Sequence, residues 1–263
     1  MVKIGIIGGS GLNDPKWMTD PKDVSINTKF GEPSSPLACG FINGVEVAIL
    51  SRHGRRHTIP PSQVNYRANI SALKEHGCTH IIATTACGSL REHIKPGDFV
   101  VVDQFIDFTK RRVTTFHESF AGGSENAVHT PMADPFDARI RGVLFEAGRE
   151  LNYAIHDKGT VVTIEGPRFS TRAESNMFRI IGADVINMTL AVDAILANEA
   201  GIPIAAVAMS TDYDCWKTDI APVTAEEVFA TFAKNVGNVK NLLFKALEKI
   251  REGALNYWRA ESE

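Results

Sequence analysis

Short apolar runs that alternate with helical patterns constrain the fold of this chain more than any other feature. The runs read as strands, and apolar residues at spacings of three and four between them read as helices. Because the two patterns alternate, we predict α/β architecture with a largely parallel or mixed central sheet flanked by helices. The predicted strands are Val2–Ile7, Val45–Leu50, His80–Thr84, Phe99–Val102, Thr160–Ile164, Asp184–Asn187 and Ile204–Met209.

The predicted helices have recognisable starts and stops. In the last one, Thr224-Ala-Glu-Glu227 is a capping box, and apolar residues then recur from Phe229 to Ile250. Earlier helices are expected after Ser62, at 140–151, at 172–181 and at 191–200. The chain has no Pro-rich or Ser-rich linker and no internal repeat, so we predict one domain spanning residues 1–263.

Charge and cysteine content narrow the class of protein. Lys and Arg number 28 against 31 Asp and Glu, for a formal net charge of -3, so nothing marks a nucleic-acid or membrane-surface binder. We therefore expect a small-molecule partner. The N-terminus has no basic start, long apolar stretch or cleavage-like site, which favours a cytoplasmic protein. The 4 Cys lack C-x-x-C spacing, so we predict reduced thiols and no structural zinc.

Two carboxylates follow the predicted strand Ile204–Met209. They are Asp212 and Asp214, at the end where ligands of parallel sheets collect. If the backbone stays extended there, residues two apart face the same side, and both acids address one planar, hydrogen-bonding ligand. The alternative is that they open a solvated loop or cap the next element, because acids are common in loops.

Three other strand ends carry groups suited to binding an anion. Ile6-Ile-Gly-Gly-Ser-Gly-Leu12 is a strand that enters a glycine-rich turn, where Ser10 adds a hydroxyl. Arg52 and His53 follow the second strand, and Thr85 with the Ala86 amide stands near the end of the third. A tight structural turn and a solvated basic loop remain as alternatives. The glycine turn matches neither the dinucleotide fingerprint nor the P-loop. His53 and His57 lack the glutamate of a zinc protease, which disfavours a metal site.

The ordered set of these segments resembles the trimeric-type purine nucleoside phosphorylase family, over about Ile4 to Trp216. The resemblance implies the single-domain nucleoside phosphorylase fold, cleavage of an N-glycosidic bond by inorganic phosphate, no metal and no organic cofactor. It also implies a homotrimer, or a hexamer made of two trimers. The motifs that carry it are Gly8-Gly-Ser-Gly11, Arg52-His-Gly54, Thr84-Thr-Ala-Cys-Gly-Ser89, Glu165-Gly-Pro-Arg-Phe-Ser170, Arg172-Ala-Glu174, Asn187-Met-Thr189 and Thr211-Asp-Tyr-Asp-Cys-Trp216.

The resemblance assigns a role to each site residue. Met188 would underlie the ribose, Phe169 would contact the base, and His129 would reach the sugar end of a neighbouring subunit's site. The phosphate ligands would be Ser10, Arg52, His53, Thr85, Ala86 and Thr189. Adenine would be recognised by Ser170, Asp212 and Asp214, with Asp212 as the catalytic acid, and the alkylthio pocket would be lined by Ala225, Val228 and Phe229.

These roles point to phosphorolysis of S-methyl-5'-thioadenosine, a reaction of methionine and purine salvage. A carboxylate accepts from an exocyclic amino group, so Asp212 favours a 6-aminopurine over a 6-oxopurine. The alternatives are a broader adenosine or methylthioinosine phosphorylase, a nucleosidase that uses water, and a non-catalytic purine-binding protein. One departure from the family pattern is Leu190-Ala-Val-Asp193, which lacks a proline and carries a shorter acid.

Overall fold

A single mixed sheet organises the part of the chain that the structure describes. The computed structural model describes residues 2–8, 17–120, 123, 126–219 and 224–255, without the side chains of Ala225, Val228, Phe229 and Phe232. Within these residues the sheet has 11 strands, in the order β2-β3-β4-β1-β5-β10-β9-β7, while β11 pairs with β5 and β6, and β6 pairs with β8. The predicted α/β fold with a mixed sheet is therefore confirmed.

The strands that position the predicted site run parallel at the centre of this sheet. β1 lies between β4 and β5, and β5 lies between β1 and β11, all with parallel pairing. Their carboxyl ends therefore reach the same edge of the sheet. The strands are β1 (Lys3–Gly8), β2 (Thr19–Val24), β3 (Leu37–Ile42), β4 (Val45–Ser51), β5 (His80–Ser89), β6 (Phe99–Val102), β7 (Gln104–Phe108), β8 (Ile155–His156), β9 (Thr160–Ile164), β10 (Val185–Asn187) and β11 (Ile204–Asp212).

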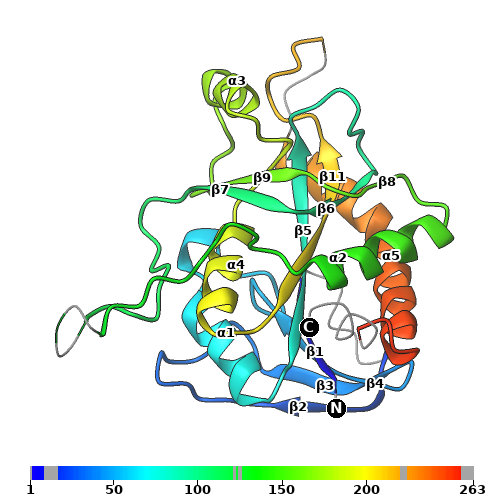
Figure 1. Cartoon of the computed structure of the whole chain (residues 1–263). Helices are drawn as coiled ribbons and strands as arrows, with labels where there is room; N and C mark the ends of the chain where they lie inside the picture. Colours follow the sequence, from blue (N-terminus) through cyan, green and yellow to red (C-terminus); the bar gives the residue numbers. More distant parts are fainter. Residues whose placement is uncertain (1, 9–16, 121–122, 124–125, 220–223, 256–263) are drawn as a thin grey trace.

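Helices cover both faces of the central strands (Figure 1). Helices α1 (Tyr66–Glu75) and α4 (Leu190–Glu199) pack on one face, and α2 (Ala138–Glu150) and α5 (Ala225–Arg251) pack on the other. Helix α3 (Arg172–Ile180) lies apart from both pairs, beyond the strand ends. Successive strand residues alternate between the two cores, as β-structure requires: Ala206 and Ala208 join the α1–α4 core, and Val207 joins the α2–α5 core.

The long final helix begins as its sequence predicts. Thr224 caps the N-terminus of α5: its side chain accepts a hydrogen bond from the Glu227 amide, and Glu227 returns one to the Thr224 amide. Its residues Leu242 and Leu243 are buried in the core between α2, α5 and the sheet. No helix among the described residues is both long and apolar enough to cross a membrane.

Strand boundaries and edge strands differ most from the predictions. β5 and β11 are longer than predicted, so Thr85, Ala86 and Asp212 lie within strands rather than in the loops that follow. Strands β2, β3, β7 and β8 were not predicted from the sequence. β2 is polar and mostly exposed, and β3 is interrupted by Gly40, where a Cβ atom would lie 2.8 Å from the Thr19 carbonyl oxygen. Neither segment has the uninterrupted apolar pattern that marks a central strand.

Candidate active site

The ends of β4, β1 and β5 bring the predicted anion-binding residues together. Gly8 pairs with Ser51 at the last position of the β1–β4 ladder, and the Arg52 amide donates to the Gly8 carbonyl at 3.0 Å. The chain therefore leaves β4 beside the point where the glycine-rich turn begins. The predicted ligand Ser10 lies in that turn, outside the described residues.

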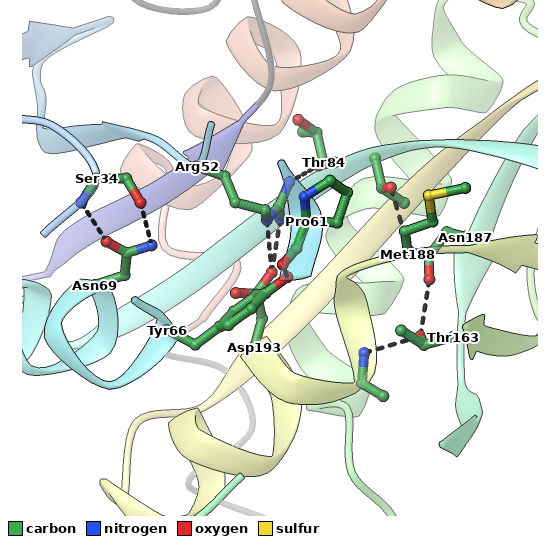
Figure 2. A network of polar contacts seen from close by, with 12 residues as sticks. Ser34, Arg52, Pro61, Tyr66, Asn69, Thr84, Thr163, Asn187, Met188 and Asp193 are labelled. Carbon is green, nitrogen blue, oxygen red and sulfur yellow. Dashed lines mark hydrogen bonds and ion pairs between the residues drawn. The ribbon is translucent and has the colours of Figure 1, made fainter. Parts of the chain in front are cut away.

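Arg52 is held by protein partners in the interior (Figure 2). Its side chain is 2 % exposed, its Nε donates to Asp193 Oδ2 at 2.9 Å, and its Nη1 donates to the Thr84 carbonyl at 3.0 Å. Nη2 lies 2.8 Å from the same carboxylate oxygen but has no aligned hydrogen bond within the described part of the chain. Protein partners therefore occupy much of the Arg52 guanidinium, and only part of it is available to an anion.

Asp193 has a role that its sequence context does not predict. It stood out only as the shorter acid of an atypical segment, yet it is fully buried on the first turn of α4 and forms the ion pair with Arg52. Burial raises the pKa of the Asp193 carboxyl, and the Arg52 charge opposes that rise. The helix begins at Leu190, directly after Thr189, so the atypical segment forms a regular helical turn.

A chain of buried hydrogen bonds links the ends of β9, β10 and β5. The Ala191 amide donates to Thr163 Oγ1 at 3.1 Å, and Thr163 donates to Asn187 Oδ1 at 2.8 Å (Figure 2). Asn187 Nδ2 then donates to Thr85 Oγ1 at 3.2 Å, and Thr85 donates to the Ala86 carbonyl. The Thr85 hydroxyl is thus fixed at the same edge as Arg52, and its position follows from groups on three strands.

Arg112 is a second buried guanidinium that sequence reasoning missed. Its side chain is 2 % exposed. It donates to the Tyr66 hydroxyl at 2.8 Å, to the Met188 carbonyl and to the Glu165 carbonyl, and it pairs with the Glu165 carboxylate. It therefore ties α1 to the end of β9 and to the turn that carries the predicted ribose contact. Its sequence neighbourhood, Lys110-Arg-Arg-Val113, gives no sign of burial.

Met188 packs directly against the loop after β9. Gly166 has a φ of 63°, and a Cβ atom there would lie 2.5 Å from Met188 Sδ. Only glycine fits this close approach in the left-handed conformation. The loop continues to Phe169, which is 40 % exposed, and to Ser170, whose buried Oγ has no hydrogen-bond partner in the described structure. An unpaired buried hydroxyl is unusual and is suited to contact with a ligand.

Asp212 and Asp214 lie together, but not in the way the sequence analysis assumed. The backbone is not extended: Asp214 has a φ of 48°, and its amide donates to Asp212 Oδ1 at 2.7 Å in a turn. The two acids nevertheless meet over β5, because a Cβ atom on Gly88 would lie 3.0 Å from Asp212 Oδ1 and 3.3 Å from Asp214 Cβ. The buried Trp216 fixes this turn by donating to the Ser89 carbonyl at 2.8 Å.

Burial makes both carboxyl groups weaker acids than usual. It raises the pKa of Asp212, and it raises the pKa of Asp214 to about 6, where the negative charge of Asp212 acts in the same direction. One oxygen, Asp214 Oδ2, is buried without a hydrogen-bond partner among the described residues. The pair can therefore hold a proton near neutral pH and present it to a ligand.

One of the remaining predicted residues adjoins this group: the Asp193 amide donates to the Thr189 carbonyl at 3.5 Å. His129 is exposed, and its recorded ring contact is with Phe120, at 5.9 Å between centroids. Thr189 is buried at the start of α4. The predicted alkylthio-pocket residues Ala225, Val228 and Phe229 lie on the first turns of α5, but their side chains are outside the described structure. No group of three or more metal-binding side chains occurs in the described part of the chain.

The raised pKa of Asp214 predicts how Asp214→Asn changes the pH dependence of stability. The folded state holds this proton more tightly than the unfolded state, so its stabilising contribution is complete below about pH 4 and is lost as pH rises through about 6. Asp214→Asn should therefore gain stability relative to the parent between pH 4 and 7, as measured by urea unfolding. The exposed control Asp157→Asn should show no such trend, and parallel pH profiles for Asp214→Asn and the parent would contradict the prediction.

Comparison with known proteins places this arrangement in a family. The sequence matches the Phosphorylase superfamily over residues 3–248. It is 52% identical to an S-methyl-5'-thioadenosine phosphorylase of Drosophila melanogaster over 95% of this chain and 86% of that protein, and 52% identical to one of Xenopus tropicalis over 95% and 89%.

A solved structure agrees with this relationship. The methylthioadenosine phosphorylase of Schistosoma mansoni in complex with adenine superposes with a TM-score of 0.88, at 43% identity, over 96% of this chain and 93% of that one. A mutant of the same enzyme in complex with methylthioadenosine gives a TM-score of 0.87. The chain therefore belongs to the Phosphorylase superfamily and, within it, to the S-methyl-5'-thioadenosine phosphorylase family.

Proposed function

We propose that this protein is a pentosyltransferase that converts S-methyl-5'-thioadenosine and phosphate into adenine and 5-methylthioribose 1-phosphate. The proposal rests on one observation: the Arg52 cluster and the pair of acids, Asp212 and Asp214, lie at different points along one strand. Thr85 on β5 stands beside the Arg52 cluster, and Gly88 on the same strand stands beneath the two acids. Three residues of a strand span about 10 Å, which leaves room for a ribosyl ring between phosphate and base.

The groups at the two ends suit the two charges of the reaction. When the bond between C1' and N9 breaks, its electron pair goes to the purine and positive charge develops on the ribosyl ring. A phosphate oxygen held by Arg52, His53, Thr85, the Ala86 amide, Thr189 and Ser10 then bonds to C1'. Asp212, whose pKa burial raises, supplies a proton to N7 and so neutralises the departing adenine.

The central turn holds the sugar between these two ends. Met188 lies on the turn that Arg112 and Gly166 fix, and we assign it the face of the ribose. Phe169 and Ser170 stand on the following loop and would contact the base together with Asp214. The first turns of α5, with Ala225, Val228 and Phe229, would receive the methylthio group. No metal or organic cofactor enters this scheme, since phosphate is the co-substrate.

The direct test is adenine release from S-methyl-5'-thioadenosine with and without phosphate. Release should depend strictly on phosphate, because the groups near Arg52 are arranged for an anion rather than for water. Equal release in phosphate-free buffer would instead identify a nucleosidase. Binding of the nucleoside without release under either condition would identify a purine-binding protein, and equal rates with methylthioinosine would identify a broader phosphorylase.

Asp212→Asn tests the assignment of the base-binding acid. Asparagine can donate to a carbonyl oxygen but has no titratable proton for N7, so activity on 6-aminopurine nucleosides should fall. The preference ratio should move toward 6-oxopurines by about tenfold or more. The measurement is kcat/KM for both nucleoside classes. Asp219→Asn, an exposed change on the same loop, should leave the ratio unaltered, and an unaltered ratio in Asp212→Asn would remove it from base recognition.

We also propose that the working unit is one domain assembled as a homotrimer, or as a pair of trimers, in the cytoplasm. The segment between β7 and α2 extends away from the sheet (Figure 1) and carries His129 with the exposed apolar residues Val113, Phe120 and Val128. Such residues on an extended segment suit contact with a neighbouring subunit. His129 would complete the sugar end of that subunit's site.

Dilution tests the shared site. Light scattering and activity should be followed together across a concentration series, and activity should disappear as the oligomer dissociates. His129→Ala should lower activity while leaving the oligomer intact. A fully active monomer would end the proposal of a shared site and leave the phosphorolysis assignment standing.

A further inference from the structure

His53 presents one ring nitrogen to the backbone. Its Nδ1 lies 2.9 Å from the carbonyl oxygen of Ile59. A carbonyl oxygen can only accept a hydrogen bond, so Nδ1 must carry the proton that is shared between them. This contact fixes the ring orientation, and it fixes the tautomer whenever the ring is neutral.

The surroundings of His53 keep the ring neutral. Burial lowers the pKa of His53 to about 4, and the positive charge of Arg52 acts in the same direction, with smaller contributions from His57 and Arg112. The hydrogen bond to Ile59 opposes these effects but does not outweigh them. The His57 ring lies beside it, tilted by 31°, at 4.6 Å between centroids. A neutral ring has one N–H, and the Ile59 contact places it on Nδ1. Nε2 is therefore an acceptor, with no hydrogen-bond partner recorded for it among the described residues.

We propose that His53 Nε2 accepts the P–OH proton of the bound phosphate and so makes the anion site selective for oxyanions that carry a proton. This inference rests on the proposed function, because it takes the anion site beside Arg52 to be the phosphate site. His53 therefore accepts a hydrogen bond from phosphate and does not donate one. Arg52 Nη2, which has no aligned hydrogen bond within the described structure, supplies a donor to the charged oxygens, and His53 supplies the acceptor that the one protonated oxygen requires.

The protons of the reaction can be accounted for with this contact in place. Hydrogen phosphate brings one P–OH proton, and its attack on C1' yields a sugar phosphate monoester whose remaining proton is more acidic. His53 Nε2 accepts a hydrogen bond from that proton without taking it up, and the proton passes to solvent when the product leaves. Asp212 gives a proton to N7 of adenine and takes one up from solvent, so the sum is a proton moved from phosphate to adenine.

Sulfate distinguishes an acceptor from a donor at this position. Sulfate has the shape and charge of hydrogen phosphate but carries no proton near neutral pH. Its oxygen would face the Nε2 lone pair, and neither group could be satisfied. Sites that leave a polar group unpaired discriminate strongly between otherwise similar ligands. Phosphate keeps at least one P–OH between pH 6 and 8, whereas sulfate can bind only if the ring first takes up a proton.

The experiment measures sulfate as a competitive inhibitor of phosphate in the adenine-release assay at constant ionic strength. In the parent enzyme the sulfate inhibition constant should exceed the phosphate KM by about 100-fold at pH 7.5. It should fall by about tenfold for each unit of pH lowered, because sulfate binding takes up one proton. His53→Gln, whose amide can donate, should reduce the discrimination by about tenfold or more. His57→Gln should leave it unchanged.

The outcomes separate this inference from the proposed function. Two results would overturn the acceptor role while leaving phosphorolysis intact. One is a sulfate inhibition constant in the parent that equals the phosphate KM. The other is a His53→Gln variant with the same ratio of these two constants as the parent. If the parent releases no adenine, the proposed function fails instead. Calorimetric titration of the parent and both variants with inorganic phosphate and with sulfate then decides the role of His53. The quantity compared is the ratio of the sulfate dissociation constant to the phosphate dissociation constant.

Discussion

The buried ion pair between Arg52 and Asp193 is the interaction on which the site depends. A guanidinium that is 2 % exposed needs a charge partner, and Asp193 supplies it from the first turn of α4. Breaking such a pair typically costs about 3–5 kcal/mol, because the remaining charge stays buried. The pair joins the end of β4 to α4. Arg52 Nη1 also donates a hydrogen bond to the carbonyl of Thr84 on β5. These contacts fix the proposed phosphate side of the site in the absence of a ligand.

The rest of the site follows from the geometry of the parallel strands. β5 carries Thr85 at the proposed phosphate side and Gly88 at the proposed base side, so one strand sets the distance between the two. Arg112 holds the turn between them through the carbonyls of Met188 and Glu165. Each half has its own electrostatics: buried positive charge at Arg52 favours an anion, while burial at Asp212 and Asp214 favours the protonated acid.

The sequence predicted those helices and strands whose formation depends on patterns of neighbouring residues. The capping box at Thr224 and the apolar strands of the sheet centre are confirmed, because period and capping are visible over a few residues. Edge strand β2 was missed because it is polar. The Arg52–Asp193 pair joins residues 141 positions apart, and Arg112 reaches Met188 across 76, so neither partner could be read from the sequence alone. The assumption of an extended backbone at Asp214 was wrong. The Asp214 amide donates a hydrogen bond to the Asp212 side chain, and this contact forms a turn.

The central claim is that one edge of the sheet binds phosphate and a 6-aminopurine at the same time, on opposite sides of the sugar. The most direct measurement is a crystal structure of the protein with phosphate and an uncleavable analogue of S-methyl-5'-thioadenosine. The account predicts phosphate oxygens within hydrogen-bonding distance of Arg52 Nη2 and the Thr85 hydroxyl, with purine N7 against Asp212. Phosphate bound away from Arg52, or a purine that does not reach Asp212, would contradict it.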